Sequence, residues 1–444
     1  MWNKIKFLTV ASILVCQQCF AQTTFFSIFN SAQTLLGNRF FNITNSLSAG
    51  TTENEEQISF TKSGGTLSNA KVYVTANTNV VTTTFDVVIN STVGNQSIPV
   101  TASSTGLFED SDSDTISTSD EVNWEVTAAA WVSMAITHAT VSFAPTTFHY
   151  IYYSRVAQDV CTTSGGKFVQ LNGTLSAAVG SEVNAKLNMK IAGTLEKARI
   201  FVFSNAASNT NTIKSRINGA DGNISVSITA STTGELLDSS NTDSISVDND
   251  VNFTGSTSAT GDINIRGVQA SFTPSVSGSF MANTGTASGT TSFGNETGYL
   301  APSGRLLSGV TTEAQAAIKV ASDYTVSNLQ TYILTNTGGD AGTIDFRLDT
   351  GGGPSSSALT MSITAATTGW FIDSVNSVSV SSTNKVDYRV VGPTSGSFEP
   401  TIISANFLAP ADTSIKTVNG LANASVKTVN GLARASVKTV DGLA

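Results

Sequence analysis

The stretch Val100-Thr-Ala-Ser-Ser-Thr-Gly106 decides the fold, because the chain contains a version of it three times. The second copy is Ile228-Thr-Ala-Ser-Thr-Thr-Gly234 and the third is Ile363-Thr-Ala-Ala-Thr-Thr-Gly369. The copies begin 128 and then 135 residues apart. Each is followed, four residues after its glycine, by an acid: Asp110, Asp238 and Asp373. Self-similarity at a nearly fixed spacing predicts one structural unit repeated three times.

Further landmarks keep the same order around this block. Upstream, Leu67-Ser-Asn-Ala-Lys-Val-Tyr-Val74 aligns with residues 195–202 and 326–333. Downstream, three aromatic positions align, at Trp124, Phe253 and Tyr388. Each unit then closes with an apolar stretch that ends in proline, at Pro145, Pro274 and Pro410. Ordered matches over this length indicate a triplicated domain.

Within each copy the hydrophobic period is two. Lys71-Val-Tyr-Val-Thr and Ala198-Arg-Ile-Phe-Val-Phe alternate polar and apolar residues, which is typical of strands with one buried face. Turn signals such as Asn218-Gly219 separate the runs. The spacing predicts roughly eight short strands per unit. We therefore predict an all-β protein of three tandem antiparallel β-sandwich domains, jelly-roll-like, with a short-repeat C-terminal tail.

The predicted boundaries follow from the repeats and from changes in composition. The three β-sandwich repeats are expected at residues 22–148, 168–274 and 298–410. Residues 149–167 and the Ser/Gly/Thr-rich residues 275–297 are interpreted as linkers. A signal peptide is predicted at residues 1–21, and 11-residue repeats form the tail at residues 411–444.

The signal-peptide prediction rests on the start of the chain. Lys4 and Lys6 precede an apolar run from Phe7 to Val15, and Cys19 and Ala21 have the small side chains of a cleavage site. The run is too short to span a membrane as a helix, although an uncleaved anchor is the alternative. No later stretch offers about 18 uninterrupted apolar residues, so no transmembrane segment is predicted.

Composition narrows the class of protein further. Only 12% of residues are charged, and the net charge is −9 at a sequence pI of about 4.8. An acidic chain does not attract phosphate backbones, so nucleic acid is not an expected partner. Without its signal peptide the chain keeps one cysteine, Cys161, which excludes an intrachain disulfide. We favour a buried thiol there over pairing between chains.

The tail repeats an 11-residue unit that begins Ser414-Ile-Lys-Thr-Val-Asn-Gly-Leu-Ala. Asn-Gly or Asp-Gly in the middle of each unit disfavours a helix and favours a tight turn. Short strand–turn repeats or a disordered extension are both compatible with this pattern. The tail is cationic through Lys416, Lys427, Arg434 and Lys438. It could therefore dock on an acidic neighbour, including another copy, or have no dedicated role.

Two resemblances accompany these patterns. The tail resembles Lys-x-x-Asn-Gly-Leu/Val-Ala repeats of uncharacterised bacterial surface and phage virion-like proteins, over about 31 residues. The Thr-Thr-Gly block with its following Asp is similar to tandem jelly-roll modules of such proteins. These resemblances imply a jelly-roll surface protein and transfer no functional residues. The export signal favours the bacterial surface class over the virion class.

The sequence contains no complete catalytic or metal-binding pattern. His138 and His149 have no accompanying Gly-x-Ser-x-Gly elbow, and no His-Glu-x-x-His or P-loop is present. The acidic run at residues 109–114 has the alternating oxygen ligands that suit calcium, but its spacing favours a charged edge strand. We predict no enzyme activity, no cofactor, and no catalytic, cofactor-binding or metal site.

Aromatic residues offer one alternative function. Trp124, Phe253 and Tyr388 recur at one repeat position, as do Tyr73, Phe201 and Tyr332, which favours core packing for both sets. Trp131 and Trp370 have no aromatic equivalents and are candidate sugar-stacking platforms.

The sequence therefore favours an exported structural or adhesive protein, secreted or on the cell surface, that acts through assembly or binding. A carbohydrate-binding module protein is the alternative, and a secreted carboxylate-dependent hydrolase ranks below it. The expected partners are other copies, another surface component or glycans.

Overall fold

The computed structural model describes residues 23–28, 38–44, 53, 57–127, 134–175, 180–285, 291–305 and 311–410, with four short strands in the tail. The predicted signal peptide at residues 1–21 and the candidate platform Trp131 lie outside these residues. Within the described part, no helix has the length and apolarity needed to cross a membrane.

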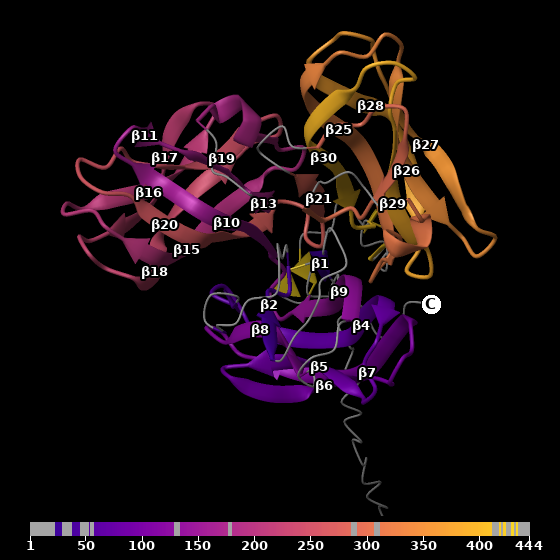
Figure 1. Cartoon of the computed structure of the whole chain (residues 1–444), viewed down its shortest axis with the longest axis horizontal. Helices are drawn as coiled ribbons and strands as arrows, with labels where there is room; N and C mark the ends of the chain where they lie inside the picture. Colours follow the sequence, from indigo (N-terminus) through magenta and orange to yellow (C-terminus); the bar gives the residue numbers. More distant parts are fainter. Residues whose placement is uncertain are drawn as a thin grey trace, which may run out of the picture.

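The described chain is built almost entirely from antiparallel strands, which form three lobes around a common centre (Figure 1). The first lobe contains β1 (Thr23–Ile28), β2 (Arg39–Phe41), β3 (Ile58–Ser59), β4 (Gly65–Asn77), β5 (Thr83–Ile89), β6 (Thr92–Val100), β7 (Gly106–Ile116), β8 (Glu121–Thr127) and β9 (Met134–Pro145). Its two sheets have the orders β1-β9-β4-β7 and β2-β8-β5-β6, with β3 also paired to β8.

The second lobe repeats this arrangement. It contains β10 (Tyr150–Thr162), β11 (Gly165–Gly166), β12 (Phe168–Gln170), β13 (Gly173–Leu175), the 3-10 turn η2 (Glu182–Ala185), β14 (Leu187–Asn188), β15 (Gly193–Asn205), β16 (Asn211–Ile217), β17 (Ala220–Ile228), β18 (Gly234–Ile245), β19 (Asp250–Gly255) and β20 (Ile263–Pro274). Its sheets run β11-β10-β20-β15-β18, with β13 parallel to β10, and β12-β19-β16-β17, with β14 beside β19.

The third lobe has the same plan. It contains β21 (Phe280–Gly285), β22 (Thr297–Leu300), β23 (Gly304–Arg305), the 3-10 turn η3 (Glu313–Gln315), β24 (Ile318–Lys319), β25 (Tyr324–Asn336), β26 (Gly342–Asp349), β27 (Pro354–Ile363), β28 (Gly369–Val380), β29 (Lys385–Val391) and β30 (Phe398–Leu408). The sheet orders are β23-β21-β30-β25-β28 and β22-β29-β26-β27.

The shared strand order is that of a jelly roll. If the eight main strands of the second lobe are counted in chain order from β10, omitting the short β11, β13 and β14, one sheet runs 1-8-3-6 and the other 2-7-4-5. Two four-stranded sheets connected in this way form the double-sheet jelly roll. The predicted fold class is confirmed, and the lobes are called the first, second and third sandwiches below.

The repeated sequence block forms the same turn in every sandwich. Its first residue ends β6, β17 or β27, and its glycine begins the strand that follows. The glycine φ angles are 111° at Gly106, 94° at Gly234 and 104° at Gly369. Such angles are costly for residues with a Cβ atom, which explains the glycine in each copy. The turn carries the chain from one sheet of the sandwich to the other.

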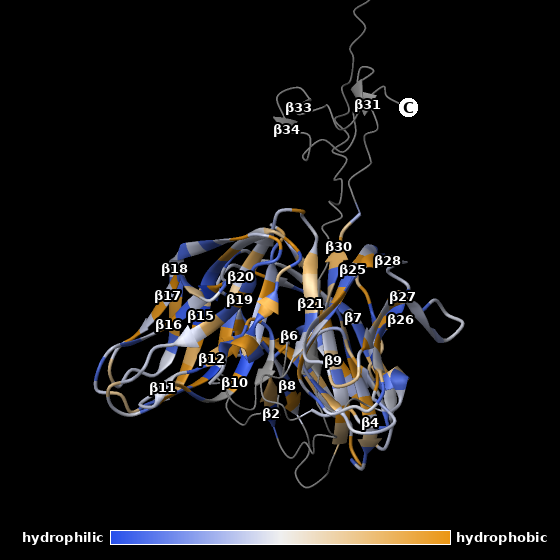
Figure 2. Cartoon of the chain, turned by 90° about the horizontal axis from the view of Figure 1, so that it is seen from above, coloured by the Kyte–Doolittle hydropathy of each residue, from blue (hydrophilic) through white to orange (hydrophobic). Residues whose placement is uncertain are grey.

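Alternation within the strands builds the cores, and Figure 2 shows hydrophobic and hydrophilic residues interleaved along them. In β4, Val72 and Val74 are buried while Lys71 and Tyr73 are partly exposed. The aromatic set Trp124, Phe253 and Tyr388 is at most 1% exposed, as predicted for core residues. The second set is not fully buried as predicted, because Tyr73, Phe201 and Tyr332 are only half-buried, although Tyr332 packs against the core.

The two predicted linkers are corrected by the structure. Residues 149–167 contain β10, which pairs with β20 over most of its length. Its side chains alternate between two cores, since Ile151 and Tyr153 join the core of the first sandwich while Tyr150 and Tyr152 join that of the second. A strand buried on both faces shows no polar alternation, so its sequence resembled a connector.

Residues 275–297 likewise contain β21, the first strand of the third sandwich, which pairs with β30. All six residues of β21 are buried. The second and third sandwiches share one continuous hydrophobic cluster, whereas the first has its own.

The described part of the tail consists of two short strand pairs, one in each of its first two units. Val418 pairs with Leu421 and Val429 pairs with Leu432. The Asn-Gly dipeptides between these strands lie outside the described residues, so the tight turn remains a prediction. The third unit, at residues 436–444, lies outside the described residues.

Candidate functional site

His149 lies close to a serine, but its hydrogen bonds do not suit catalysis. Ser63 Oγ is 3.4 Å from His149 Nδ1, which also lies 2.9 Å from the Thr147 carbonyl oxygen. A carbonyl accepts hydrogen bonds only, so this contact assigns the proton of the neutral ring to Nδ1 and leaves no lone pair there for the serine. His138 Nδ1 similarly donates to the Gln315 carbonyl at 3.0 Å. Neither histidine is therefore placed as a base toward a serine.

The recurring acids connect the two sheets at their edges. Each carboxylate accepts a backbone N–H of the facing strand: Ser97 to Asp110 (2.6 Å), Ser225 to Asp238 (2.8 Å) and Thr360 to Asp373 (3.2 Å). Burial alone would raise the pKa of Asp238, but these hydrogen bonds lower it to about 2. Across the described ranges, no three His, Cys, Asp or Glu side chains gather as metal ligands would. These acids occupy edge N–H groups that could otherwise pair with another strand.

The remaining candidates from the sequence are mostly covered. Trp370 is half-buried, packs against the core and contacts Tyr332 edge-on at 5.4 Å between ring centroids. Cys161 is confirmed as a buried thiol, with its Sγ 3.8 Å from the Thr212 carbonyl oxygen, and burial raises its pKa to about 11. Cys161 is 0% exposed and offers no surface for a ligand, whereas Trp370 stays partly exposed beside Tyr332.

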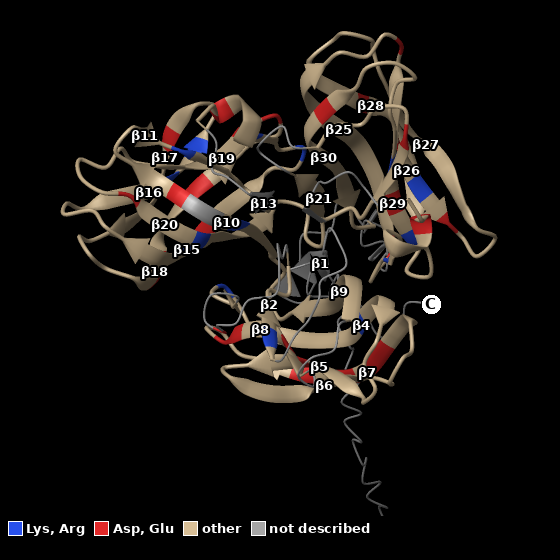
Figure 3. Ribbon diagram, in the orientation of Figure 1, with Lys and Arg blue, Asp and Glu red and all other residues tan. Residues whose placement is uncertain are grey.

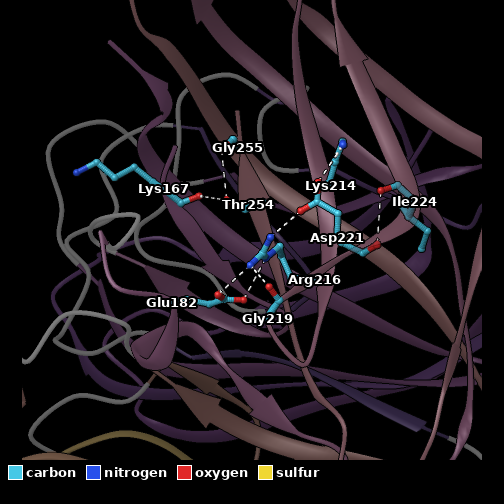
Figure 4. Close-up of polar contacts among 10 residues, drawn as sticks. Lys167, Glu182, Lys214, Arg216, Gly219, Asp221, Ile224, Thr254 and Gly255 are labelled. Carbon is cyan, nitrogen blue, oxygen red and sulfur yellow. Dashed lines mark hydrogen bonds and ion pairs between the residues drawn. The ribbon is translucent and has the colours of Figure 1, made fainter. Parts of the chain in front are cut away.

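Two 3-10 turns are fixed to the outer sheet faces by arginines. Figure 4 shows Arg216 on β16 between Glu182 of η2 and Asp221 of β17. Its Nε and Nη2 each lie 3.1 Å from one Glu182 oxygen, and its Nη1 lies 2.6 Å from Asp221. In the third sandwich Arg347 holds Glu313 of η3 in the same two-pronged way, at 2.7 and 3.1 Å. Paired contacts of this kind fix orientation as well as distance.

The anchored turns matter because the chain next to them contacts the neighbouring sandwich. The first sandwich presents the corresponding segment, around Gln57 and Ser59, to the second. The second presents Asn188 to the third, and the third presents Gln315 to the first. The three sandwiches therefore make one type of head-to-tail contact in a closed cycle.

The contact of the first sandwich with the second centres on Arg199 of β15, which is 3% exposed. Its Nη1 donates to the Gln57 carbonyl at 3.0 Å and its Nη2 to Glu121 at 2.6 Å, both in the first sandwich. Its Nε lies 2.7 Å from Glu235 of its own sandwich. One buried cation thus holds two carboxylates from two sandwiches.

Two further pairs complete this contact. The side chain of Gln269 on β20 accepts from the Ser59 N–H at 3.1 Å and donates to the Ser59 carbonyl at 2.5 Å. Lys62 of the first sandwich lies 2.6 Å from Glu196 of the second. The paired hydrogen bonds between the Gln269 side chain and the Ser59 backbone resemble those between two adjacent strands. They fix the position of one sandwich relative to the other.

The contact of the second sandwich with the third is amide-rich. The bonds are Gln330 Nε2 to the Asn188 carbonyl (2.7 Å), Gln170 Nε2 to the Thr401 carbonyl (3.1 Å), Asn172 Nδ2 to Asn283 Oδ1 (3.0 Å) and Asn283 Nδ2 to the Asn172 carbonyl (3.0 Å). Beside them the rings of Tyr150 and Phe280 stack at 5.0 Å. These directional amide hydrogen bonds favour one relative orientation of the sandwiches, although the side-chain oxygens of Gln170 and Gln330 are buried without a partner.

The contact of the third sandwich with the first closes the cycle through His138 of β9. The ring stacks on Tyr73 of β4 at 5.6 Å and donates to the Gln315 carbonyl of the third sandwich. Burial lowers its pKa to about 4, and the hydrogen bond to Gln315 opposes this shift. The ring therefore stays neutral over most of the physiological pH range.

Strand register shows which residues are equivalent. Arg199 faces Gln269, Gln330 faces Ser404 and Lys71 faces Thr140 across the same pair of strands, just after the same bulge. Arg199 and Gln330 reach across to the neighbouring sandwich. Lys71 instead pairs with Glu109 of its own sandwich at 2.5 Å.

The repeat aligns these segments but does not by itself predict their contacts with a neighbouring sandwich. A long polar side chain recurs at the same position of each repeat, within residues 67–74, 195–202 and 326–333. This recurrence is the sequence signal for a contact between sandwiches. Strand alternation alone places such residues in solvent.

Two carboxyls on one arginine do not ionise alike. Burial is the largest influence on Glu121 and raises its pKa, the neighbouring Glu235 adds to the rise, Arg199 opposes it, and the result is about 7. Burial acts in the same direction on Glu235, but hydrogen bonding to Arg199 brings its pKa below the ordinary value. The pair therefore takes up a proton near neutral pH.

The contact between the first and second sandwiches is expected to weaken between about pH 5 and pH 8. A raised carboxyl pKa means that the folded state binds the proton more tightly than the unfolded state. The stabilisation that the proton on Glu121 gives to the folded state is complete below the ordinary pKa of 4.5. It is lost as the pH rises through about 7. With solvent screening we expect a loss of about 1–2 kcal/mol, measured as urea unfolding midpoints across this range.

The Glu121→Gln variant should lose this pH dependence. Glu109→Gln is the matched control, because Glu109 is half-exposed and pairs within the first sandwich. If the urea unfolding midpoint of Glu121→Gln still fell with rising pH as in the native protein, the effect would belong to another group.

No protein-family model matches the chain, and a search of curated proteins found no match. The inference about function therefore rests on the fold and on the contacts between the sandwiches.

Proposed function

We propose that this protein is a structural module of an exported surface assembly, which acts by presenting folded surfaces to partners and not by catalysis. The observation that carries the proposal is the closed head-to-tail cycle of three related contacts. Heterologous contacts that close make rings, and here one chain supplies all three members of the ring. Covalent linkage fixes the order of the members and avoids the concentration dependence of a trimer.

The composition fits a static, exposed role. Charged residues are sparse over the three lobes, as Figure 3 shows. The outer edge strands are bonded internally by Asp110, Asp238 and Asp373, which limits unregulated pairing between copies. Because these edge strands do not pair readily with another copy, association between copies needs a separate element.

The tail is our candidate for that element. A two-stranded hairpin alone is at best marginally stable in water, so the tail hairpins would gain stability by docking. The repeats from Ser414 onward carry Lys416, Lys427, Arg434 and Lys438 and one acid, Asp441. Residues 22–148 carry three Lys or Arg and eleven Asp or Glu, a net charge of −8. The cationic tail of one copy therefore complements the first sandwich of another.

Size-exclusion chromatography with light scattering tests the proposal on residues 22–444 and on a variant that ends at Thr413. Assemblies that need the tail, and that salt dissociates, are the expected result. Monomers in both samples would contradict self-assembly, and binding to a glycan array instead would favour the carbohydrate-binding alternative.

A further inference from the structure

The molecule divides into two parts with separate hydrophobic cores. The second and third sandwiches share one cluster, while the first has its own and receives Ile151 and Tyr153 of β10. Besides these two apolar side chains, the described contacts across this division include the hydrogen bonds and ion pairs of Arg199, Gln269, Lys62 with Glu196, and His138. Polar contacts re-form readily after separation, because water satisfies the groups meanwhile.

The chain crosses this division through a short connection. Pro145 ends β9 and Tyr150 begins β10, so residues 146–149 alone join the first sandwich to the rest. Such short connections between modules favour exchange of a module between two copies, because the exchanged contacts equal the original ones.

We propose that the first sandwich is an exchangeable module, which leaves its own second and third sandwiches and docks in the same way on those of a second copy. The partner is thus another copy of this chain, and the docking surface is the one formed by β15, β20 and η3. This inference rests on the proposed assembly function and specifies a route that does not need the tail.

Two histidines at the division make the exchange sensitive to acid. His138 is buried against Tyr73, Thr137 and the Gln315 carbonyl, and no described acid forms an ion pair with it. His149 lies in the connection itself, is fully buried and contacts Phe143 edge-on.

The charged groups near the two rings do not compensate for protonation. Lys62 and Glu196 both influence His149 but pair with each other. Among the described residues, Arg199, Glu121 and Glu235 also carry charge at the division. Burial lowers the pKa of both histidines. Protonation of Glu121 stabilises the closed form over part of the same pH range, but two buried histidines oppose it. The closed form consequently loses stability as the pH falls below about 6.5, since separated sandwiches bind the two histidine protons that the closed form excludes.

The test mixes two full-chain samples that carry different affinity tags. Each mixture is held at about pH 4.5, returned to about pH 7.5, purified on one tag and probed for the other. We expect mixed complexes after the acid step, and about ten-fold fewer from the His138→Gln variant, which keeps a donor for Gln315 but takes no proton.

A second variant makes the test independent of acid. His138→Arg places a permanent charge at the closing contact and should give mixed complexes at neutral pH, with circular dichroism confirming its strand content. Absence of mixed complexes in both the acid-treated native chain and His138→Arg would overturn the proposal.

Repeating the exchange with the variant that ends at Thr413 separates the two proposals. Exchange without the tail supports the module exchange even if tail-dependent assembly fails. Mixed complexes that form only with the tail would overturn the exchange and leave the assembly function standing.

Discussion

Replacement of Arg199 by alanine is expected to lower the free energy of unfolding by about 3–5 kcal/mol, because it leaves Glu121 and Glu235 facing each other without their shared cation. The side chain is 3% exposed and also loses its bond to the Gln57 carbonyl. Urea unfolding of the full chain measures the change. The first sandwich should separate earlier than in the native protein, which limited proteolysis at residues 146–149 would detect.

Lys71→Ala is the matched control for this prediction. Lys71 occupies the equivalent repeat position but pairs with the half-exposed Glu109 inside its own sandwich. An exposed pair of this kind contributes about 0–1 kcal/mol. Equal losses for Arg199→Ala and Lys71→Ala would show that the contact between the sandwiches adds nothing to the stability of the chain.

Tyr152→Ala is expected to cost about 3–5 kcal/mol, as truncation of a buried ring in a core strand does. Its side chain is 0% exposed and packs within 4.8 Å of Tyr150 and 5.8 Å of Phe272 between ring centroids. Thermal and urea unfolding would both report the loss. The result bears directly on residues 149–167, since truncation in a linker would cost little.

Val375→Ala provides the comparison for this second prediction. Val375 is 89% exposed on β28, so its truncation should change stability by no more than about 0.5 kcal/mol. A Tyr152→Ala variant as stable as this control would contradict the assignment of β10 as a core strand shared by two sandwiches.

The cycle of contacts suggests how triplication was used. Each sandwich presents the equivalent segment to the next one, and the residue that meets that segment differs: an arginine and a glutamine in one contact, amides in the next and a histidine in the third. Three identical contacts could exchange with one another, whereas three chemically distinct ones specify a single arrangement.

The sequence by itself determined the threefold repeat and the position of its recurring turn. The recurring block requires glycine at a left-handed turn, so Gly106, Gly234 and Gly369 mark the same point of each jelly roll. Alternation predicted the strands whose outer face meets solvent, such as β4 and β15. The short paired strands of the tail are compatible with the same local rules, because hairpin pairing depends on a few neighbouring residues.

Only the tertiary structure decided the strands and side chains that lie between sandwiches. β10 and β21 are buried on both faces by neighbouring sandwiches, which removes the alternation that identifies a strand. Arg199 and His138 occupy positions that alternation assigns to solvent, yet both are buried by a neighbour far away in sequence. Local patterns record which face of a strand is outward, but they do not record what covers that face.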